Sequence, residues 1–185
     1  MKVKVGFHYM SERRWWELNH EMNQDKFLRP SKRLINVGSV IDPDIPSDLP
    51  SWAHDGYIFA FPDKEAPGPW STYEHGMQEW RRLMGSLGEK VIVTRFDVRG
   101  GFVVDRAPFA DFQYDQSPYN KEAYQQALRA YAMSRVKADR YKGNFRMPEL
   151  IMKKPIPLER LVLHQVLKRA IIGEGDQRRV VYVPG

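Results

Sequence analysis

Alternating polar and apolar residues mark the first strand that the sequence predicts. Residues 2–10 read KVKVGFHYM, in which valine and phenylalanine alternate with lysine and histidine. This period of two is typical of a half-buried β-strand. Other short apolar runs, bounded by glycine or proline, predict further strands over residues 56–61, 90–98, 102–105, 149–152, 160–166 and 180–183. We expect the last two to pair through the turn at residues 173–175.

Three segments carry apolar residues at helical spacing instead. The pattern predicts helices over residues 12–22, 71–87 and 121–141. Ser11 and Asn120 can cap the first and third, and Gly88 can end the second. Residues 23–50 and 107–119 are predicted to be loops. The strands and helices do not alternate as βαβ units. The sequence therefore predicts a single α+β domain over residues 1–185, with a mostly antiparallel split central sheet and about three helices.

Composition narrows the class of protein. Hydrophobic residues make up 42% and aromatic residues 12% of the 185 positions, as expected for a folded domain and unlike a disordered chain. No apolar run approaches the roughly 20 residues of a membrane helix, so we expect no membrane partner. The chain has no cysteine, which excludes disulfides and thiolate metal sites. We expect a cytoplasmic protein that uses no metal.

Positive charge is concentrated in one part of the chain. From residue 121 onward there are 14 lysines and arginines against 6 acidic residues, a net of +8, whereas the first 120 residues carry 15 against 17, a net of −2. Such an excess can build a face that attracts DNA, RNA or a phosphorylated small molecule. It is equally compatible with an ordinary solvated surface.

The sequence lacks the motifs of several enzyme classes, and three other segments are candidates for a functional site. There is no dinucleotide-binding GxGxxG, no phosphate-binding GxxxxGK[ST] and no zinc-binding HExxH. The first candidate segment, GFHY, contains His8 and Tyr9; the second, YIFAF, contains Tyr57 and Phe59. The third is PELIM followed by IPLERL, in which Glu149 begins an apolar strand and needs a partner or a function if it is buried.

Together these segments resemble the His-Tyr-Glu class of ADP-ribosyltransferases. That class has a histidine on its first core strand, an aromatic residue on the second segment and a glutamate at the head of a late strand. The late glutamate with the following Ile-Pro turn is the most similar part, and it is reminiscent of bacterial enzymes that modify DNA. The sequence departs from the family at Met10, where threonine or serine is common, and at Met147, where arginine- and asparagine-modifying members have a second catalytic residue.

The resemblance implies an enzyme that uses NAD as a substrate. Glu149 would be catalytic, holding the ribose and stabilising the positive charge that develops when nicotinamide leaves. His8 would bind a ribose hydroxyl, and Tyr9, Tyr57 or Phe59 would contribute to NAD binding, one ring stacking on nicotinamide. We accordingly expect His8, Tyr57 and Glu149 to face one cleft. The acceptor implied by the basic C-terminal third is a nucleic acid or a nucleotide.

Two alternatives remain open at this point. The chain can be a nucleic-acid-binding module without catalysis, with Tyr131 or Tyr141 stacking on bases. Its phosphate contacts would then come from the basic residues of the C-terminal third, Arg135, Lys137, Arg140, Lys142, Arg146, Lys153 and Lys154. It can also be similar to RNA 2′-phosphotransferases, which share the architecture and depend on arginines and a histidine. The alternative to a catalytic role is that Glu149 forms a surface ion pair with Arg146 or Lys153. The sequence does not indicate an oligomeric state.

Overall fold

The computed structural model describes residues 3–35, 43–62, 67–115 and 118–185. Within them lie four α-helices, α1 (Glu12–Asn19), α2 (Glu74–Leu87), α3 (Ala107–Tyr114) and α4 (Lys121–Met133). The longer strands are β1 (Val5–Ser11), β4 (Gly56–Pro62), β5 (Lys90–Asp97), β6 (Phe102–Asp105), β8 (Pro148–Met152), β10 (Val162–Ile172) and β11 (Arg179–Pro184). Two-residue strands are β2 (Phe27–Leu28), β3 (Lys32–Arg33), β7 (Val136–Lys137) and β9 (Ile156–Pro157).

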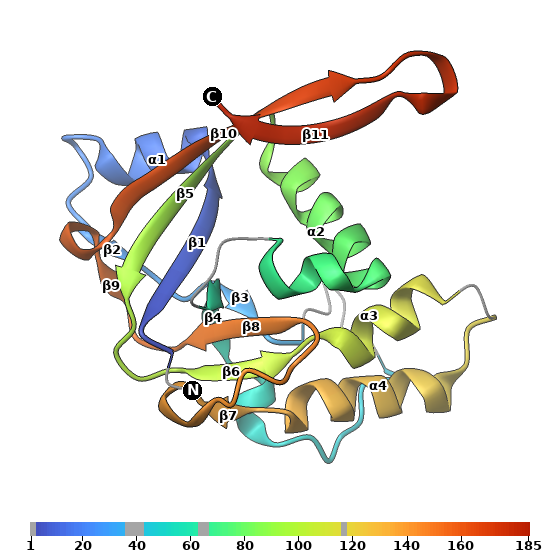
Figure 1. The fold of residues 1–185 in the computed structure, drawn as a ribbon. Coiled ribbons are helices and arrows are strands. Elements are labelled where there is room, and N and C mark those ends of the chain that lie inside the picture. Colours follow the sequence, from blue (N-terminus) through green and yellow to red (C-terminus); the bar gives the residue numbers. More distant parts are fainter. Residues whose placement is uncertain (1–2, 36–42, 63–66, 116–117) are drawn as a thin grey trace.

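The main sheet is antiparallel at every pairing and runs in the order β11-β10-β5-β1-β4-β8-β6-β7, with β3 paired to β4. The prediction that the first strand and the strand from residue 90 are neighbours is confirmed, because β1 pairs with β5 along its whole length. The α+β class is confirmed as well. In Figure 1 the strands β1, β5 and β10 run in a clearly different direction from β6 and β8.

The change of direction coincides with a gap between β1 and β4. These strands pair only at Gly6 with Pro62 and Phe7 with Phe61. The other end of β4 pairs with β3, where Lys32 lies opposite Tyr57. Backbone groups of alternate residues point to the same edge of a strand. The Leu34 amide, just after β3, donates to the Asp55 carbonyl at 3.4 Å. The carbonyl of Asp55 points to the same edge of β4 as that of Phe59, so β3 lies on the edge along which β1 pairs only at its other end. We call the space on this edge, between the β1 and β3 pairings, the β4 gap.

Helices cover one face of the sheet more fully than the other. The face of Phe7 and Phe61 is covered by α2, α3 and α4; it packs on Trp70 and Met84 and, farther along, on Leu128. The opposite face packs against α1 and against the segments around β2 and β9. A glycine is required at position 6 on this second face, since a Cβ there would lie 2.4 Å from the Phe96 ring.

The predicted helices differ from the observed ones in several places, and α2 starts at Glu74 instead of residue 71. Residues 107–114 form helix α3 instead of part of a loop. The third predicted helix ends at Met133 instead of residue 141, because Val136 leaves the helix to pair with Val103 of β6. The first helix is also shorter than predicted and ends at Asn19, and residues 23–50 include the short strands β2 and β3.

The predicted C-terminal hairpin is confirmed and is longer than the sequence suggested. Strands β10 and β11 pair from Leu167 opposite Pro184 to Ile172 opposite Arg179. The hairpin projects from the body of the protein past the end of α2 (Figure 1). Tyr182 anchors its base, because its hydroxyl donates to the Gly88 carbonyl at 2.9 Å. No helix in the described ranges is both long and apolar enough to cross a membrane.

Candidate active site

His8 occupies the β4 gap. Its Nδ1 lies 2.7 Å from the carbonyl oxygen of Phe59, so the imidazole takes a position that a strand partner would otherwise fill. Burial lowers the pKa of His8 from 6.5 to about 4, with the Phe59 carbonyl opposing this change and Lys32 and Arg14 adding to it. The ring is therefore neutral at neutral pH. Because a neutral ring carries one proton and the carbonyl can only accept, Nδ1 is the protonated nitrogen and Nε2 is an acceptor.

Glu149 lies on β8, and two residues from other elements hold its carboxylate. The Tyr131 hydroxyl of α4 donates to Oε1 at 2.7 Å, and Arg106 Nη1 lies 3.8 Å from the same oxygen. Only 12% of the Glu149 side chain is exposed. Burial raises the pKa of Glu149, and although Arg106 and Tyr131 oppose the rise, the value stays above the usual range. The expected surface partners of Glu149 are wrong, since Arg146 pairs with Asp111 and Lys153 with Asp55.

Both residues keep one polar atom without a partner among the residues that the structure describes. Glu149 Oε2 and His8 Nε2 make no hydrogen bond with any residue that the structure describes. Neither atom is among the buried unsatisfied atoms of the described residues, which are Trp80 Nε1 and Arg160 Nε. Each is therefore accessible to solvent. A half-buried side chain with one atom fixed and the other accessible is preorganised to bind a ligand.

The relative placement of His8 and Glu149 follows from the strand register. His8 lies opposite Thr94, on the Met10 face of the sheet, whereas Glu149 lies opposite Val104, on the Phe61 face. The polar contacts of the two side chains with described residues are to Phe59 for His8 and to Tyr131 and Arg106 for Glu149, so neither contacts the other. Their strands β1 and β8 flank β4, so they are two strand spacings apart, roughly 10 Å. The prediction that His8 and Glu149 face one cleft is therefore wrong by the strand register. A ligand that touches both must be elongated and must reach from one face of the sheet to the other.

Lys32 of β3 lies at the same gap, although no sequence pattern distinguishes it as a site residue. Its register opposite Tyr57 places it on the Glu149 face of the sheet. Its charge contributes to lowering the pKa of His8 and of Glu149, so it acts on both groups. Lys32 is exposed and forms no ion pair with the described residues. It is a free cation beside the two candidate residues.

The predicted aromatic residues are less accessible than the expected stacking role requires. Tyr57 is 2% exposed, and its hydroxyl donates to the Trp52 carbonyl at 2.9 Å. Tyr9 is 8% exposed and packs edge-on against Phe61. Phe59 is half-buried and bonds to His8 through its carbonyl. The structure thus brings Phe59 and His8 together, and Tyr57 offers no open face to a shared cleft.

The basic residues of the C-terminal third do not form one free surface. Arg146 and Lys153 are in ion pairs, and the guanidinium of Arg135 lies 3.9 Å from the centre of the Trp52 ring. Tyr131 and Tyr141 are 2% and 5% exposed. The expectation that one of these tyrosines stacks on nucleic-acid bases is therefore wrong for this structure.

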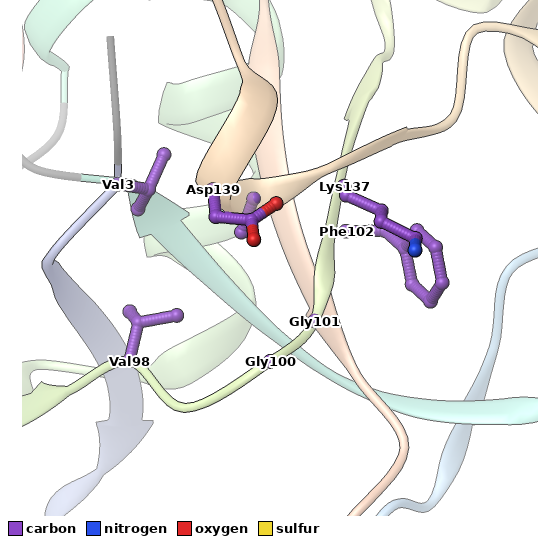
Figure 2. A pocket seen from close by; sticks show the side chains of 8 residues that line it. Val3, Val98, Gly100, Gly101, Phe102, Lys137 and Asp139 are labelled. Atoms are coloured by element: carbon purple, nitrogen blue, oxygen red, sulfur yellow. The ribbon is translucent and has the colours of Figure 1, made fainter.

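A separate hollow of about 450 Å³ lies beside β6 and β7 (Figure 2). Its wall is mainly small or apolar residues, including Val3, Val98 and Phe102. Among the described residues that line it, Lys137 and Asp139 are the charged ones. None of the predicted site residues lines it. Among the described residues the hollow has no histidine in its wall. The described residues do include one direct carboxylate–histidine contact, between Asp111 Oδ1 and His75 Nδ1 at 2.9 Å, away from the β4 gap.

Comparison with known proteins adds no further constraint. No protein-family model matches the chain, and neither a curated protein nor a solved structure is significantly similar to it.

Proposed function

We propose that this protein is an ADP-ribosyltransferase that uses NAD as a substrate, with Glu149 as its catalytic residue. The observation that carries the proposal is the Glu149 carboxylate, whose Oε1 is held by Tyr131 and whose Oε2 is accessible to solvent. A carboxylate fixed in this way can bind a ribose hydroxyl and face a positive charge that forms on the sugar. The similarity of the three sequence segments to the His-Tyr-Glu class supports the same assignment.

The reaction breaks the bond between the nicotinamide nitrogen and ribose C1′. The bonding electrons move to the nicotinamide ring, which leaves as a neutral molecule, and the sugar develops positive charge. An acceptor oxygen or nitrogen then bonds to C1′ and loses its proton. Stabilising the developing charge with a fixed carboxylate lowers the barrier, because the charge is larger in the transition state than in the bound substrate.

His8 and the β4 gap support a long substrate. The neutral His8 ring has an accessible acceptor nitrogen, Nε2, which suits a hydroxyl group. In an extended strand the amide and carbonyl of one residue point to the same side, so the Phe59 amide also points to the gap, where it can bind a carboxamide. The roughly 10 Å between the strands of His8 and Glu149 suits a dinucleotide better than a small metabolite. Of the aromatic residues, the half-buried Phe59 is the better candidate for stacking.

The acceptor in this proposal is a nucleic acid or a nucleotide. Lys137, Arg140, Lys142 and Lys154 are exposed and form no ion pair with other described residues. They can contact phosphates without giving sequence specificity. The engaged side chains of Arg135, Arg146 and Lys153 would have to release their partners first.

The test is incubation of the protein with labelled NAD, alone and with DNA, RNA or a cell lysate. We expect release of nicotinamide and label in a nucleic acid or nucleotide. Glu149→Gln should lower the rate at saturating NAD by about 10²–10³-fold, as found for deleted charge-stabilising groups, with little change in NAD affinity. Glutamine keeps an oxygen for the Tyr131 hydroxyl but carries no charge. Glu159→Gln, the same change at an exposed residue near β9, is the matched control.

Two outcomes would contradict the proposal. Equal rates for the wild type and Glu149→Gln would exclude Glu149 from catalysis. Absence of nicotinamide release by the wild type with every acceptor present would exclude NAD cleavage and favour a nucleic-acid-binding module. Thermal melts of each variant show whether a lost rate reflects lost folding.

A further inference from the structure

Glu79 is a buried carboxylate for which the proposed reaction has no use. It lies on α2, is 2% exposed and receives hydrogen bonds from three side chains. Arg82 Nε lies at 3.1 Å, Arg106 Nη2 at 3.0 Å and the Tyr114 hydroxyl at 2.6 Å. Burial raises the pKa of Glu79, but these three partners outweigh it and keep the pKa below its usual range. Glu79 is therefore ionised at neutral pH.

Arg106 connects Glu79 to Glu149. It directly precedes α3, and its amide donates to the Met147 carbonyl at 3.0 Å, which fixes its backbone beside β8. One guanidinium nitrogen is 3.0 Å from Glu79 Oε1, and the other is 3.8 Å from Glu149 Oε1. The guanidinium is thus shared unequally, with its hydrogen bond on Glu79 and a longer ion pair on Glu149.

We propose that Glu79 is a positioning residue that acts through Arg106: it holds the guanidinium so that Glu149 keeps Oε2 free for the substrate. The proposal depends on the proposed function, since it assigns Glu79 a role in presenting the catalytic carboxylate. It names no contact between Glu79 and NAD.

The geometry of arginine explains why the Arg106 guanidinium has to be held by a second carboxylate. A guanidinium beside a carboxylate tends to form two parallel hydrogen bonds, one to each oxygen. Such an arrangement on Glu149 would occupy Oε2 and place a full positive charge where the ribosyl cation forms. Glu79 prevents it by binding one guanidinium nitrogen at 3.0 Å. Because Arg82 also pairs with Glu79, the charge of Glu79 is compensated from both sides, and Glu149 shares only the longer contact with Arg106.

The first test measures the titration of Glu149 directly in the full chain. Carboxyl carbons of ¹³C-labelled glutamate are followed by NMR against pH, and the Glu149 signal is assigned by its loss in Glu149→Gln. Glu79→Gln should lower the pKa of Glu149, because the Glu79 charge, which adds to the effect of burial, is removed and Arg106 is free to approach. Arg106→Gln should raise the pKa of Glu149, because the nearby positive charge is lost.

Opposite shifts from two substitutions in one cluster distinguish positioning from packing. If Glu79 only packs, Glu79→Gln lowers the melting temperature and leaves the pKa of Glu149 unchanged, which would overturn the proposal. Should Glu79→Gln not fold, Arg82→Gln is the substitute, since 53% of the Arg82 side chain is exposed. Its removal draws Arg106 closer to Glu79, so the pKa of Glu149 should rise; an unchanged pKa would again overturn the proposal.

The second test uses turnover and separates this inference from the proposed function. Glu79→Gln should reduce nicotinamide release by about 10- to 100-fold, the effect typical of lost outer-shell partners, and Glu79→Asp should recover part of it. If the wild type releases no nicotinamide, the proposed function fails while the titration still decides how Glu79 acts on Glu149. If the wild type is active and Glu79→Gln has the same turnover, Glu79 does not position the catalytic group.

Discussion

Acidification should destabilise this protein through His8, and the structure gives the size of the effect. The comparison is between the wild type and His8→Gln, in which the amide can still donate to the Phe59 carbonyl. His8 has a pKa of about 4 in the folded protein against an ordinary value of 6.5. Between these values the unfolded chain binds a proton at His8 and the folded protein does not. Stability therefore falls as the pH drops from about 6.5 towards 4.

The magnitude follows from the two pKa values. One pKa unit corresponds to about 1.4 kcal/mol, so the complete effect is about 3 kcal/mol. Between pH 7.5 and pH 4.5 the linkage relation gives about 2.5 kcal/mol. Because His8 is half-buried, this value is an upper bound. It is still a large part of the 5–15 kcal/mol by which domains are commonly stable.

Urea unfolding of both proteins at pH 7.5 and pH 4.5 provides the measurement. Other groups titrate equally in the two proteins, so the difference between their losses of stability isolates His8. We expect the wild type to lose up to about 2.5 kcal/mol more than His8→Gln. An equal loss in both would refute a neutral His8 bonded in the β4 gap. A smaller loss in the wild type would mean that folding favours the protonated ring.

Two further substitutions test the packing and the site. Gly6→Ala should destabilise the fold by about 1–3 kcal/mol in urea unfolding, because the new Cβ would lie 2.4 Å from the buried Phe96 ring. The matched control is Gly85→Ala, on the exposed side of α2, where a Cβ has nothing within 4 Å. This change should stabilise the fold by about 0.5–1 kcal/mol. Tyr131→Phe removes the hydrogen bond to Glu149 and should lower nicotinamide release with little change in NAD affinity; unchanged turnover would show that Tyr131 does not orient Glu149.

The strands could be predicted because their signal is local. Strand β6 was predicted with its bounds, and β5 and β8 to within one residue. Helix α3 was missed because it is short, starts with Ala107-Pro108 and has apolar residues on several sides instead of one stripe. The end of α4 was misplaced for the opposite reason. Val136 fits the helical spacing, but it pairs with Val103, which lies 33 positions earlier in the chain, and this pairing outweighs the local helical preference.

The candidate site could be predicted only in part. Glu149 was singled out correctly as a residue that needs a partner, because a carboxylate in an apolar strand must be compensated. Its partners could not be deduced, because both are distant in the sequence. Arg106, just before α3, lies 43 positions earlier, and Tyr131 of α4 lies 18 positions earlier; the fold of the sheet and helices brings them to Glu149. The one available signal was the placement of Arg106 directly after a predicted strand, where side chains reach the end of a sheet.

The charge pattern along the chain shows why sequence order is a poor guide to surface charge. The basic C-terminal third and the slightly acidic remainder fold against each other. Arg129 pairs with Asp48, Arg146 with Asp111 and Lys153 with Asp55; each pair joins a cation beyond residue 120 to an acid before it. The excess of +8 is thereby divided among pairs, and the free cations are fewer than the composition suggests. Lys32, from the part of the chain with a net negative charge, is a cation near the candidate site that forms no ion pair with the described residues, and Arg14 of the same part also acts on His8. The positive charge beside the β4 gap thus depends on the local placement of a few side chains, not on the charge of the C-terminal third.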